Sequence, residues 1–285
     1  MTKHLHMSIC CRNAWDENII MNEDIFRELQ FWYFHCNFLS FKSIVPMYRQ
    51  PQRVIFTDAS QFAGTGFTVG DNTIVHFMWE KQDRDKSSTW RELKTVANNI
   101  QSLKNDLSGK FVKIYTDNQN VVSIVNKGSM NPELQDITLH ILHMCISNNI
   151  VLEMEWIPRD DNSYVDYLSK LFVFDDWGVC KNVFDYFNLL WGPYTCDRFA
   201  DNNNRKVTLF DPKYSTPESS GIDAFAYDWF GHNNWLVPPI HLVSRCLIHM
   251  QLCKAKGTLV MQNGSRPYFR LCLLIILQNT LKNLL

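Results

Sequence analysis

Four acidic residues in this sequence stand at the ends of different expected elements, where carboxylates can meet. In chain order the elements are a strand, a helix, a strand and a helix. The four residues are Asp58, Glu92, Asp117 and Asp166. Carboxylate oxygens are ligands that magnesium prefers, and two such ions about 3.5–4 Å apart can activate a water and stabilise the leaving oxygen of a phosphodiester. The set therefore predicts a metal-dependent nuclease that uses two Mg²⁺ or Mn²⁺ ions.

Each carboxylate also has an ordinary structural explanation. Asp117-Asn118 can cap the following helix, and Asp58 and Asp166 stand where turns and helix N-termini often place a carboxylate. For Glu92 two placements are open. A capping box would turn its side chain to the backbone, whereas an N-cap at Ser88 leaves it free to face cations. Taken jointly, in this order and on these elements, the four residues favour the metal site.

The elements that would position the carboxylates follow from hydrophobic periodicity. Strands are expected at 53–58, 65–69, 73–79, 113–117 and 151–157, and helices at 16–40, 88–107, 119–127, 132–148 and from about 161. The first three strands form an antiparallel meander with a turn at Gly70-Asp71-Asn72. A right-handed crossover through the 88–107 helix lets the fourth strand pair parallel with the first. The first strand is then central, and Asp58 and Asp117 lie on neighbouring strands.

The composition sets limits on compartment and partners. The chain has 285 residues and a net charge of −1, so no overall field attracts nucleic acid. Its nine cysteines include no C-x-x-C pair, which argues against a disulfide framework or a zinc site and favours the reducing cytoplasm or nucleus. The longest apolar stretch, 271–277, is far shorter than the roughly 20 residues of a spanning helix. We expect a soluble protein without a membrane partner.

Four short motifs around the carboxylates resemble successive motifs of a known domain. They are Thr57-Asp58-Ala59-Ser60, Ser87-Ser88-Thr89-Trp90-Arg91-Glu92-Leu93-Lys94, Tyr115-Thr116-Asp117-Asn118 and Asn162-Ser163-Tyr164-Val165-Asp166-Tyr167-Leu168-Ser169-Lys170. Through them, residues 53–170 resemble the ribonuclease H domain of retroelement polyproteins. The resemblance implies an α/β fold with a mixed five-stranded sheet flanked by helices, and cleavage of the RNA strand of RNA–DNA hybrids.

The resemblance also assigns roles to residues. Asp58, Glu92, Asp117 and Asp166 would be the catalytic metal ligands, and the expected nucleic-acid contacts are Ser60, Asn118, Arg159 and Asn162. Many ribonucleases H carry a mobile histidine shortly before the last aspartate. Here that loop reads Pro158-Arg159-Asp160-Asp161, so proton delivery or product release is expected to be slower, and Arg159 could instead contact a phosphate.

The rest of the chain is divided by the same resemblance. Residues 1–50 are expected to be a helical tether from a polymerase domain of the same polyprotein, residues 51–172 the ribonuclease H-like domain, and residues 173–285 a second, smaller α/β domain. The stretch from Asp176-Trp177 to Val237-Pro238-Pro239 is similar to the region downstream of the domain in DIRS-type retrotransposons, which has been likened to DNA adenine methyltransferases. From about residue 264 its tryptophan-rich pattern is lost, which predicts an aberrant tail.

There are two alternatives to an active nuclease. Methyl transfer is disfavoured because Val237 has no donor or acceptor for an exocyclic amine and Ile240 offers no ring for stacking, which leaves the second domain a structural or remnant role. The other alternative is a catalytically inactive, nucleic-acid-binding remnant of a retrotransposon polyprotein. The four carboxylates separate it only in part from the enzyme, because a recently inactivated copy can retain all of them.

Overall fold

The computed structural model describes residues 2–36, 50–171, 178–263, 270–277 and 280–284. The chain divides into two compact units, Met1–Lys170 and Leu171–Leu285. Among the described residues, no helix combines the length and the apolar character needed to cross a membrane.

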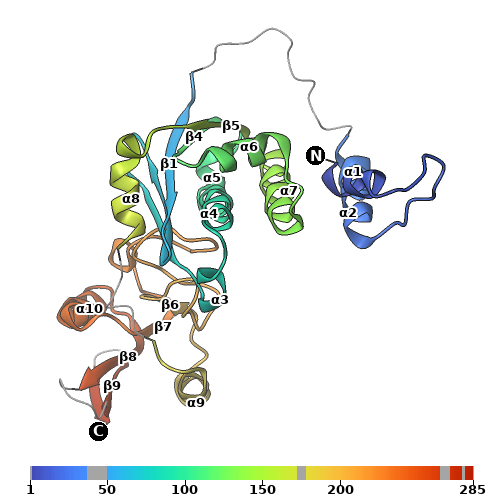
Figure 1. Ribbon diagram of the computed structural model, residues 1–285. Helices are drawn as coiled ribbons and strands as arrows, with labels where there is room; N and C mark the ends of the chain where they lie inside the picture. The colour runs from blue at the N-terminus through green and yellow to red at the C-terminus, as the bar shows by residue number, and fades with distance from the viewer. Residues whose placement is uncertain (1, 37–49, 172–177, 264–269, 278–279, 285) are drawn as a thin grey trace. The chain divides into compact units, whose positions relative to one another are not determined.

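A mixed five-stranded sheet forms the centre of the first unit, with the strand order β3-β2-β1-β4-β5 (Figure 1). β1 pairs antiparallel with β2 and parallel with β4, β2 pairs antiparallel with β3, and β4 pairs parallel with β5. The strands are β1 Arg53–Ala59, β2 Ala63–Thr68, β3 Ile74–Met78, β4 Phe111–Thr116 and β5 Val151–Trp156. The predicted meander, central first strand and parallel fourth strand are all confirmed.

Helices cover both faces of this sheet. In Figure 1, α4 and α7 lie on one side of the strands and α8 on the other. Apolar side chains of α4 and α7, among them Leu93, Ile100 and Ile141, pack with Ile55 and Ile114 of the sheet in one buried cluster. The helices are α3 Lys81–Arg84, α4 Ser88–Ser102, α5 Lys104–Leu107, α6 Gln119–Lys127, α7 Pro132–Ser147 and α8 Ser163–Ser169, with the short 3₁₀ helix η1 Arg159–Asn162 before α8.

The start of α4 differs from both placements that the sequence left open. Ser87 is the N-cap, and its side chain accepts a hydrogen bond from the amide of Trp90. Glu92 therefore lies five residues beyond the cap, outside the position that a capping box requires. The single helix expected over 88–107 is also wrong, because Leu103 leaves the helical region with φ −102° and ψ 9° and separates α4 from α5.

A glycine sets how closely α4 approaches the sheet. A Cβ atom on Gly66 of β2 would lie 1.7 Å from Oδ1 of Asn99 on α4, a distance that no packing can accommodate. A side chain at this position would have to displace the side chain of Asn99, which donates from Nδ2 to the carbonyls of Thr65 and Thr95. Because α4 also carries Glu92, this close contact helps to fix the height of Glu92 above the sheet.

The N-terminal segment holds two helices, α1 Lys3–Cys10 and α2 Glu23–His35, where one helix over 16–40 was expected. That prediction was wrong about the start because Asn22 caps α2, accepting a hydrogen bond from the amide of Ile25. Residues 37–40 lie outside the described residues. The fully buried Glu28 accepts hydrogen bonds from the backbone amides of His4 and Leu5, each at 3.0 Å. The role of this segment as a tether stays a prediction.

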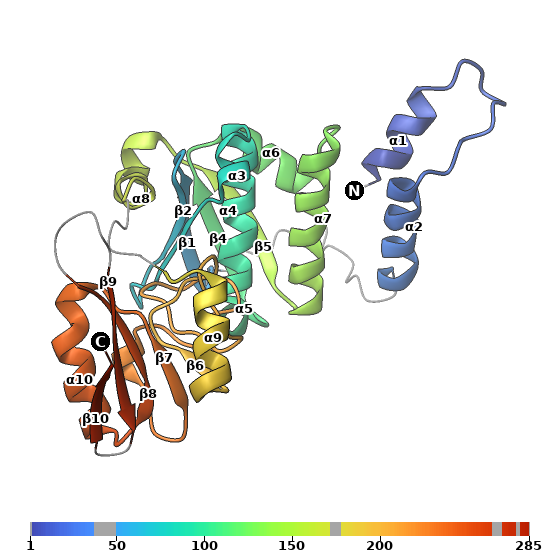
Figure 2. The same cartoon turned by 90° about the horizontal axis from the view of Figure 1, so that it is seen from below.

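The second unit is a smaller α/β structure with its own sheet, in the order β10-β9-β8-β7-β6. Trp235 and Leu236 alternate along β7, so Trp235 packs with Phe184 of α9 and Leu236 packs with Met250 of α10. The two helices therefore cover opposite faces, as Figure 2 also shows. The elements are α9 Lys181–Trp191, β6 Cys196–Asp197, η2 Ala224–Ala226, β7 Asn233–Leu236, η3 Ile240–Leu242, α10 Val243–Leu252, β8 Lys256–Asn263, β9 Arg270–Leu277 and β10 Thr280–Leu284.

Two predictions about this half concern residues outside the described ranges. Residues 176–177, with which the similarity to the DIRS-type downstream region begins, are among them. The tail from residue 264 contributes β9 and β10, while 264–269, 278–279 and 285 are again outside. Whether the tail is aberrant stays a prediction.

Candidate active site

The carboxyl ends of β1 and β4 bring two of the four acidic residues to one edge of the sheet. Phe56 pairs with Tyr115 in parallel register, so Asp58 and Asp117, two residues further along each chain, arrive at the same level. The hydroxyl of Thr57 donates a hydrogen bond to the carbonyl of Tyr115 at 3.2 Å and ties the strands together just before this edge. Asp58 is only 5% exposed. The predicted placement of both residues on neighbouring strands is confirmed.

Glu92 reaches the same edge from α4. Its Oε1 accepts a hydrogen bond from Nδ2 of Asn118 at 3.1 Å, and its Oε2 accepts one from the hydroxyl of Thr116 at 3.2 Å. Asn118 also caps α6, because its Oδ1 accepts the backbone amides of Asn120 and Val121. Of the pair considered as a cap, Asn118 takes that role, and Asp117 stays available for other contacts.

Asp166 comes from the first turn of α8 and is held by two cations. Its Oδ1 lies 3.0 Å from Nη2 of Arg159, and its Oδ2 lies 2.5 Å from Nζ of Lys170. The Nε atom of Arg159 is also 3.8 Å from Oδ2 of Asp117. The guanidinium group therefore lies between the carboxylates of Asp117 and Asp166.

The pKa directions of Asp58, Glu92 and Asp166 show how burial and neighbouring charges act at this edge of the sheet. Burial raises the pKa of Asp58, and the charges of Asp117 and Asp166 raise it further against a hydrogen bond from Ser169. Burial raises the pKa of Glu92 to about 7, with added repulsion from Asp117 and Asp58. Burial also acts to raise the pKa of Asp166, but hydrogen bonds from Lys170 and Arg159 outweigh it, and the pKa is lowered.

These side chains have the donor chemistry of a site for a hard divalent cation. Burial raises the pKa values of Asp58 and Glu92, and neighbouring carboxylates raise them further, so a bound cation would stabilise the charged forms that these surroundings disfavour. In the part of the chain that the structure describes, no group of three or more His, Cys, Asp or Glu side chains is drawn together closely enough to hold a metal. The donors fit a divalent ion, and their final approach to one another is not preformed.

The four residues expected to contact nucleic acid have different surroundings. Arg159 is 70% exposed and available to a ligand. The hydroxyl of Ser60 donates to the carbonyl of Ser169 at 2.5 Å, and Asn118 holds Glu92. Asn162 is 1% exposed and donates from Nδ2 to the carbonyl of Thr57 at 3.0 Å, so it is covered by protein in this structure. These roles stay predictions.

Sequence reasoning missed three supporting side chains. Lys170, the residue that follows α8 directly, stands four residues after Asp166, a spacing that predicts an ion pair at a helix and could have revealed the contact. Thr116 and Trp156 gave no such signal, because their contacts depend on the sheet. The indole Nε1 of Trp156 donates to the backbone carbonyl of Asp117 at 3.0 Å, and the Thr116 hydroxyl bonds Glu92.

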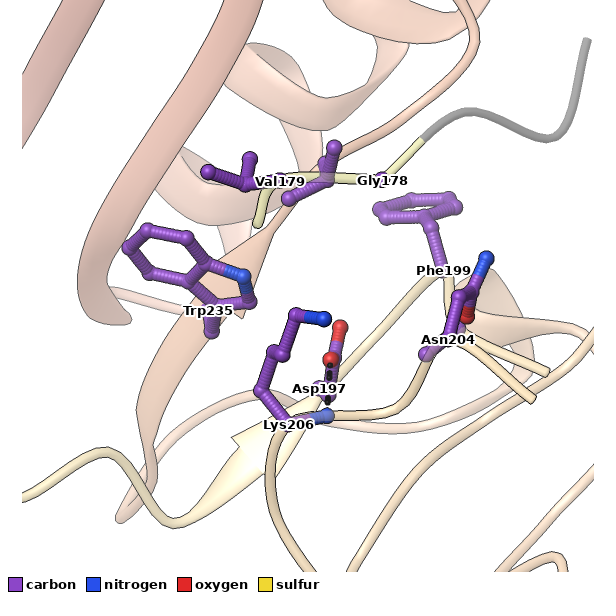
Figure 3. Close-up of a pocket in the computed structure, with 9 residues that line it drawn as sticks. Gly178, Val179, Asp197, Phe199, Asn204, Lys206 and Trp235 are labelled. Atoms are coloured by element: carbon purple, nitrogen blue, oxygen red, sulfur yellow. Dashed lines mark hydrogen bonds between the residues drawn. The ribbon is translucent and has the colours of Figure 1, made fainter. Parts of the chain in front are cut away.

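The second unit has a small pocket beside the carboxyl ends of β6 and β7. It is lined by Asp197, Phe199, Lys206, Trp235 and Val237, with others, and Figure 3 shows the carboxylate of Asp197 accepting a hydrogen bond from the backbone amide of Lys206. Val237, where a methyltransferase would carry a polar residue, is buried in an apolar cluster with Trp235. Its surroundings agree with a packing role.

A pH dependence of stability follows from Glu92. Its folded pKa of about 7 exceeds the ordinary value of 4.5, so the folded state retains a proton that the unfolded state releases. This contribution to stability is fully present below 4.5 and is lost as the pH rises through 7. Glu92→Gln should therefore raise the free energy of unfolding of the metal-free protein by about 2 kcal/mol near pH 8, and should change little near pH 4. Urea unfolding at a series of pH values measures this.

The control for this experiment is an exposed glutamate. Glu133, which pairs with Lys86 on the surface, should tolerate Glu133→Gln with a change within about 0.5 kcal/mol at every pH. A Glu92→Gln variant that is equally stable relative to wild type at both ends of the pH range would contradict the expectation.

Comparison with known proteins finds a family model and solved structures that are similar to part of this chain. The family described as "Reverse transcriptase-like" matches residues 103–172. No curated protein matches the chain. Solved structures with a similar arrangement include the ribonuclease H1 of the halophilic archaeon Halobacterium salinarum NRC-1, which is 13% identical with a TM-score of 0.32, covering 41% of this chain and 92% of that one.

Two further matches are complexes. LC11-RNase H1 with an RNA/DNA hybrid is 16% identical with a TM-score of 0.33, over 41% of this chain and 93% of that one. The foamy viral protease-reverse transcriptase with an RNA/DNA hybrid is 16% identical with a TM-score of 0.35, over 46% of this chain but only 21% of that one. TM-scores this low carry no argument of their own. The strand order and the helices on both faces confirm the predicted ribonuclease H-like α/β fold, and residues 103–172 carry a reverse transcriptase-like sequence.

Proposed function

We propose that residues 51–172 are a retroelement ribonuclease H domain that hydrolyses the RNA strand of RNA–DNA hybrids with two Mg²⁺ or Mn²⁺ ions. The observation that carries the proposal is that Asp58, Glu92 and Asp117 reach the edge of the sheet where β1 and β4 end, and that Arg159 links Asp117 to Asp166 there. The choice of substrate is supported by the resemblance of the motifs around the four carboxylates to those of retroelement ribonuclease H domains.

The proposed ligands are Asp58, Glu92, Asp117 and Asp166. Bound there, the ions would supply activation of the attacking water and charge stabilisation at the leaving oxygen. The chain's own side chains orient the ligands. Asn118 and Thr116 each donate a hydrogen bond to Glu92, and Trp156 holds the backbone of Asp117. Such partners fix ligand geometry before the substrate arrives.

Substrate selection in the proposal rests on two kinds of contact. Proteins distinguish RNA from DNA by the 2′-hydroxyl groups across the shallow minor groove of the hybrid. The exposed guanidinium of Arg159 can donate to a phosphate. A net charge of −1 adds no general attraction, so we expect weak, salt-sensitive binding and a need for the polymerase domain of the same polyprotein, in the cytoplasm or nucleus.

The second candidate is a catalytically inactive, nucleic-acid-binding remnant. It is favoured by one observation, the occupation of both Asp166 oxygens by Arg159 and Lys170, which leaves this carboxylate engaged away from any metal. In that case the fold would bind nucleic acid through its surface without hydrolysis.

A labelled RNA–DNA hybrid separates the candidates. At low ionic strength with MgCl₂, the wild-type chain should cut the RNA strand, leave all-DNA and all-RNA duplexes of the same sequence intact, and lose activity with EDTA. Asp117→Asn should lower the rate at least about 100-fold, because even outer partners of metal ligands contribute about 10–100-fold. Asp185→Asn, on the surface of α9, is the matched control and should cut at the wild-type rate. Binding that survives EDTA without any cleavage would instead support the remnant.

A further inference from the structure

Two hydrogen bonds join the segment that contains α8 to the end of β1, one near each end of the helix. Before the helix, Nδ2 of Asn162 donates to the carbonyl of Thr57 at 3.0 Å. At its last residue, the carbonyl of Ser169 accepts a hydrogen bond from the hydroxyl of Ser60 at 2.5 Å. We call these two hydrogen bonds the α8 lock. They hold the helix at both ends against one short stretch of chain.

The α8 lock encloses two of the proposed metal ligands. Asp58 lies one residue after the β1 partner of the first hydrogen bond and two residues before that of the second. Asp166 lies four residues after Asn162 and three before Ser169. The hydroxyl of Ser169 also has two acceptors, the carboxylate of Asp58 and the carbonyl of Asp166 at 2.9 Å. A shift of α8 along β1 would therefore change the separation of these two carboxylates.

Asn162 takes part in the lock at the expense of one of its own polar atoms. Its side chain is 1% exposed, and none of the described residues forms a hydrogen bond with its Oδ1 atom. A buried acceptor without a partner destabilises a fold, so packing alone would favour an apolar side chain here. The donor is the part of the amide that the position uses. Hydrogen bonds are directional, whereas apolar contacts are not, so this donor resists sliding of the helix.

We propose that the α8 lock sets the position of Asp166 relative to Asp58 for cleavage. Asn162 is then a positioning residue and not a contact for nucleic acid. A misplacement of about 1 Å can lower a rate about 100-fold, so a small movement of α8 is enough to affect the reaction. This inference rests on the nuclease proposed above and deepens it, because it names residues that act through a proposed catalytic group.

Cleavage kinetics of the full chain on an RNA–DNA hybrid separate this role from two others. Asn162→Ala should lower kcat at least about tenfold and leave KM within about twofold, because the substrate still binds while a carboxylate is misplaced. A contact for nucleic acid would instead raise KM. A purely structural residue would change the melting temperature and leave kcat of the folded protein unchanged.

The control for stability is Ile141→Val, which removes one methyl group from a side chain that is 1% exposed in the core. It should lower the melting temperature by about 2–4 °C and leave kcat and KM unchanged. Asn162→Ala loses one hydrogen bond and one unpaired acceptor together, so its melting temperature should stay within about 4 °C of wild type. A loss of kcat in Asn162→Ala alone is then a matter of position.

The other end of the lock provides a rescue. Ser60→Ala removes the hydroxyl group and should lower kcat at least about threefold with little change in KM, whereas Ser60→Thr keeps the hydroxyl and should retain most of the rate. In Ser60→Ala/Asn162→Ala the combined loss should be smaller than the product of the two single losses, because both hydrogen bonds hold the same helix.

Amide hydrogen exchange in EDTA tests the lock without any activity. The amides of Ser163–Ser169 should exchange at least about tenfold faster in Asn162→Ala than in wild type, and those of α7 should be unchanged. Unchanged exchange in α8, an unchanged kcat, or a raised KM alone would overturn the inference, and cleavage by wild type would then leave the nuclease standing. Faster exchange in α8 with no cleavage by any protein, wild type included, would support the lock and overturn the nuclease.

Discussion

Replacing Asp58 by asparagine is expected to lower cleavage of an RNA–DNA hybrid at least about 100-fold and to stabilise the metal-free fold. The activity falls because a carboxylate at the centre of the proposed metal site is lost. Mutation of a residue that only supports a metal ligand already lowers metal affinity or activity by about 10–100-fold. Stability rises because Asp58 is buried at the end of β1 with Asp117 and Asp166 nearby. A proposed metal ligand is here held in surroundings that disfavour its charged form.

The sign of the stability effect follows from the pKa. Burial, with help from the two neighbouring carboxylates, raises the pKa of Asp58 above its ordinary value. Its contribution to stability is therefore present at low pH and lost as the pH rises through the folded pKa. Asparagine carries no charge, so the difference between variant and wild type should grow toward neutral pH and vanish in acid. Urea unfolding in EDTA from acid to neutral pH measures it.

Asp106 is the matched control within the same unit, because its pKa moves in the opposite direction. Hydrogen bonds from Arg53 and Lys110 lower its pKa to about 2, so its contribution is present above the unfolded pKa and lost as the pH falls through about 2. Asp106→Asn should destabilise the fold at neutral pH and leave cleavage unchanged. If Asp58→Asn also destabilised the fold at neutral pH, burial and repulsion at Asp58 would not be the dominant effects.

The sheet and the placement of the carboxylates could be predicted because both depend on local patterns. Alternation in β1, the turn at Gly70-Asp71-Asn72 and the amphipathic face of α4 each follow from near neighbours in sequence. Once the first strand is central, connection rules leave few topologies. Asp58 and Asp117 must then lie at the same edge of the sheet, whatever the conformations of their side chains.

The features that could not be predicted depend on contacts between distant residues. The guanidinium of Arg159 between Asp117 and Asp166 requires the β4 edge and the turn before α8 to be placed together. Ser87, Ser88 and Thr89 are all good caps by type, so the sequence analysis considered Ser88 and Thr89 and missed Ser87. Glu28 can be buried because its carboxylate accepts hydrogen bonds from backbone amides of α1. The eight-residue sequence of α1 gives only a weak signal for a helix.

The second unit contains a buried ion pair whose disruption should have the largest effect on stability. Arg198 and Asp211 are each 4% exposed, with Nη1 and Oδ2 2.6 Å apart. The Nε atom of Arg198 donates to Oδ1 of Asn234 at 2.8 Å, and the guanidinium carbon lies 5.7 Å from the ring centroid of Trp229. In each of these contacts the guanidinium group faces another protein side chain. Its charge therefore depends on Asp211 for compensation.

Asp211→Ala should lower the free energy of unfolding of the second unit by about 3–5 kcal/mol, because it leaves the charge of Arg198 buried without a partner. Replacing both residues, as Arg198→Met/Asp211→Leu, should recover most of that loss, since an apolar pair of similar volume avoids the desolvation of two ions. Urea unfolding followed by the fluorescence of the buried Trp229 and Trp235 measures both. The exposed pair Lys181 and Asp185 is the control, and its double alanine variant should shift stability by less than about 1 kcal/mol. If Asp211→Ala were as mild as that control, water would reach Arg198 and the pair would not be a buried one in solution.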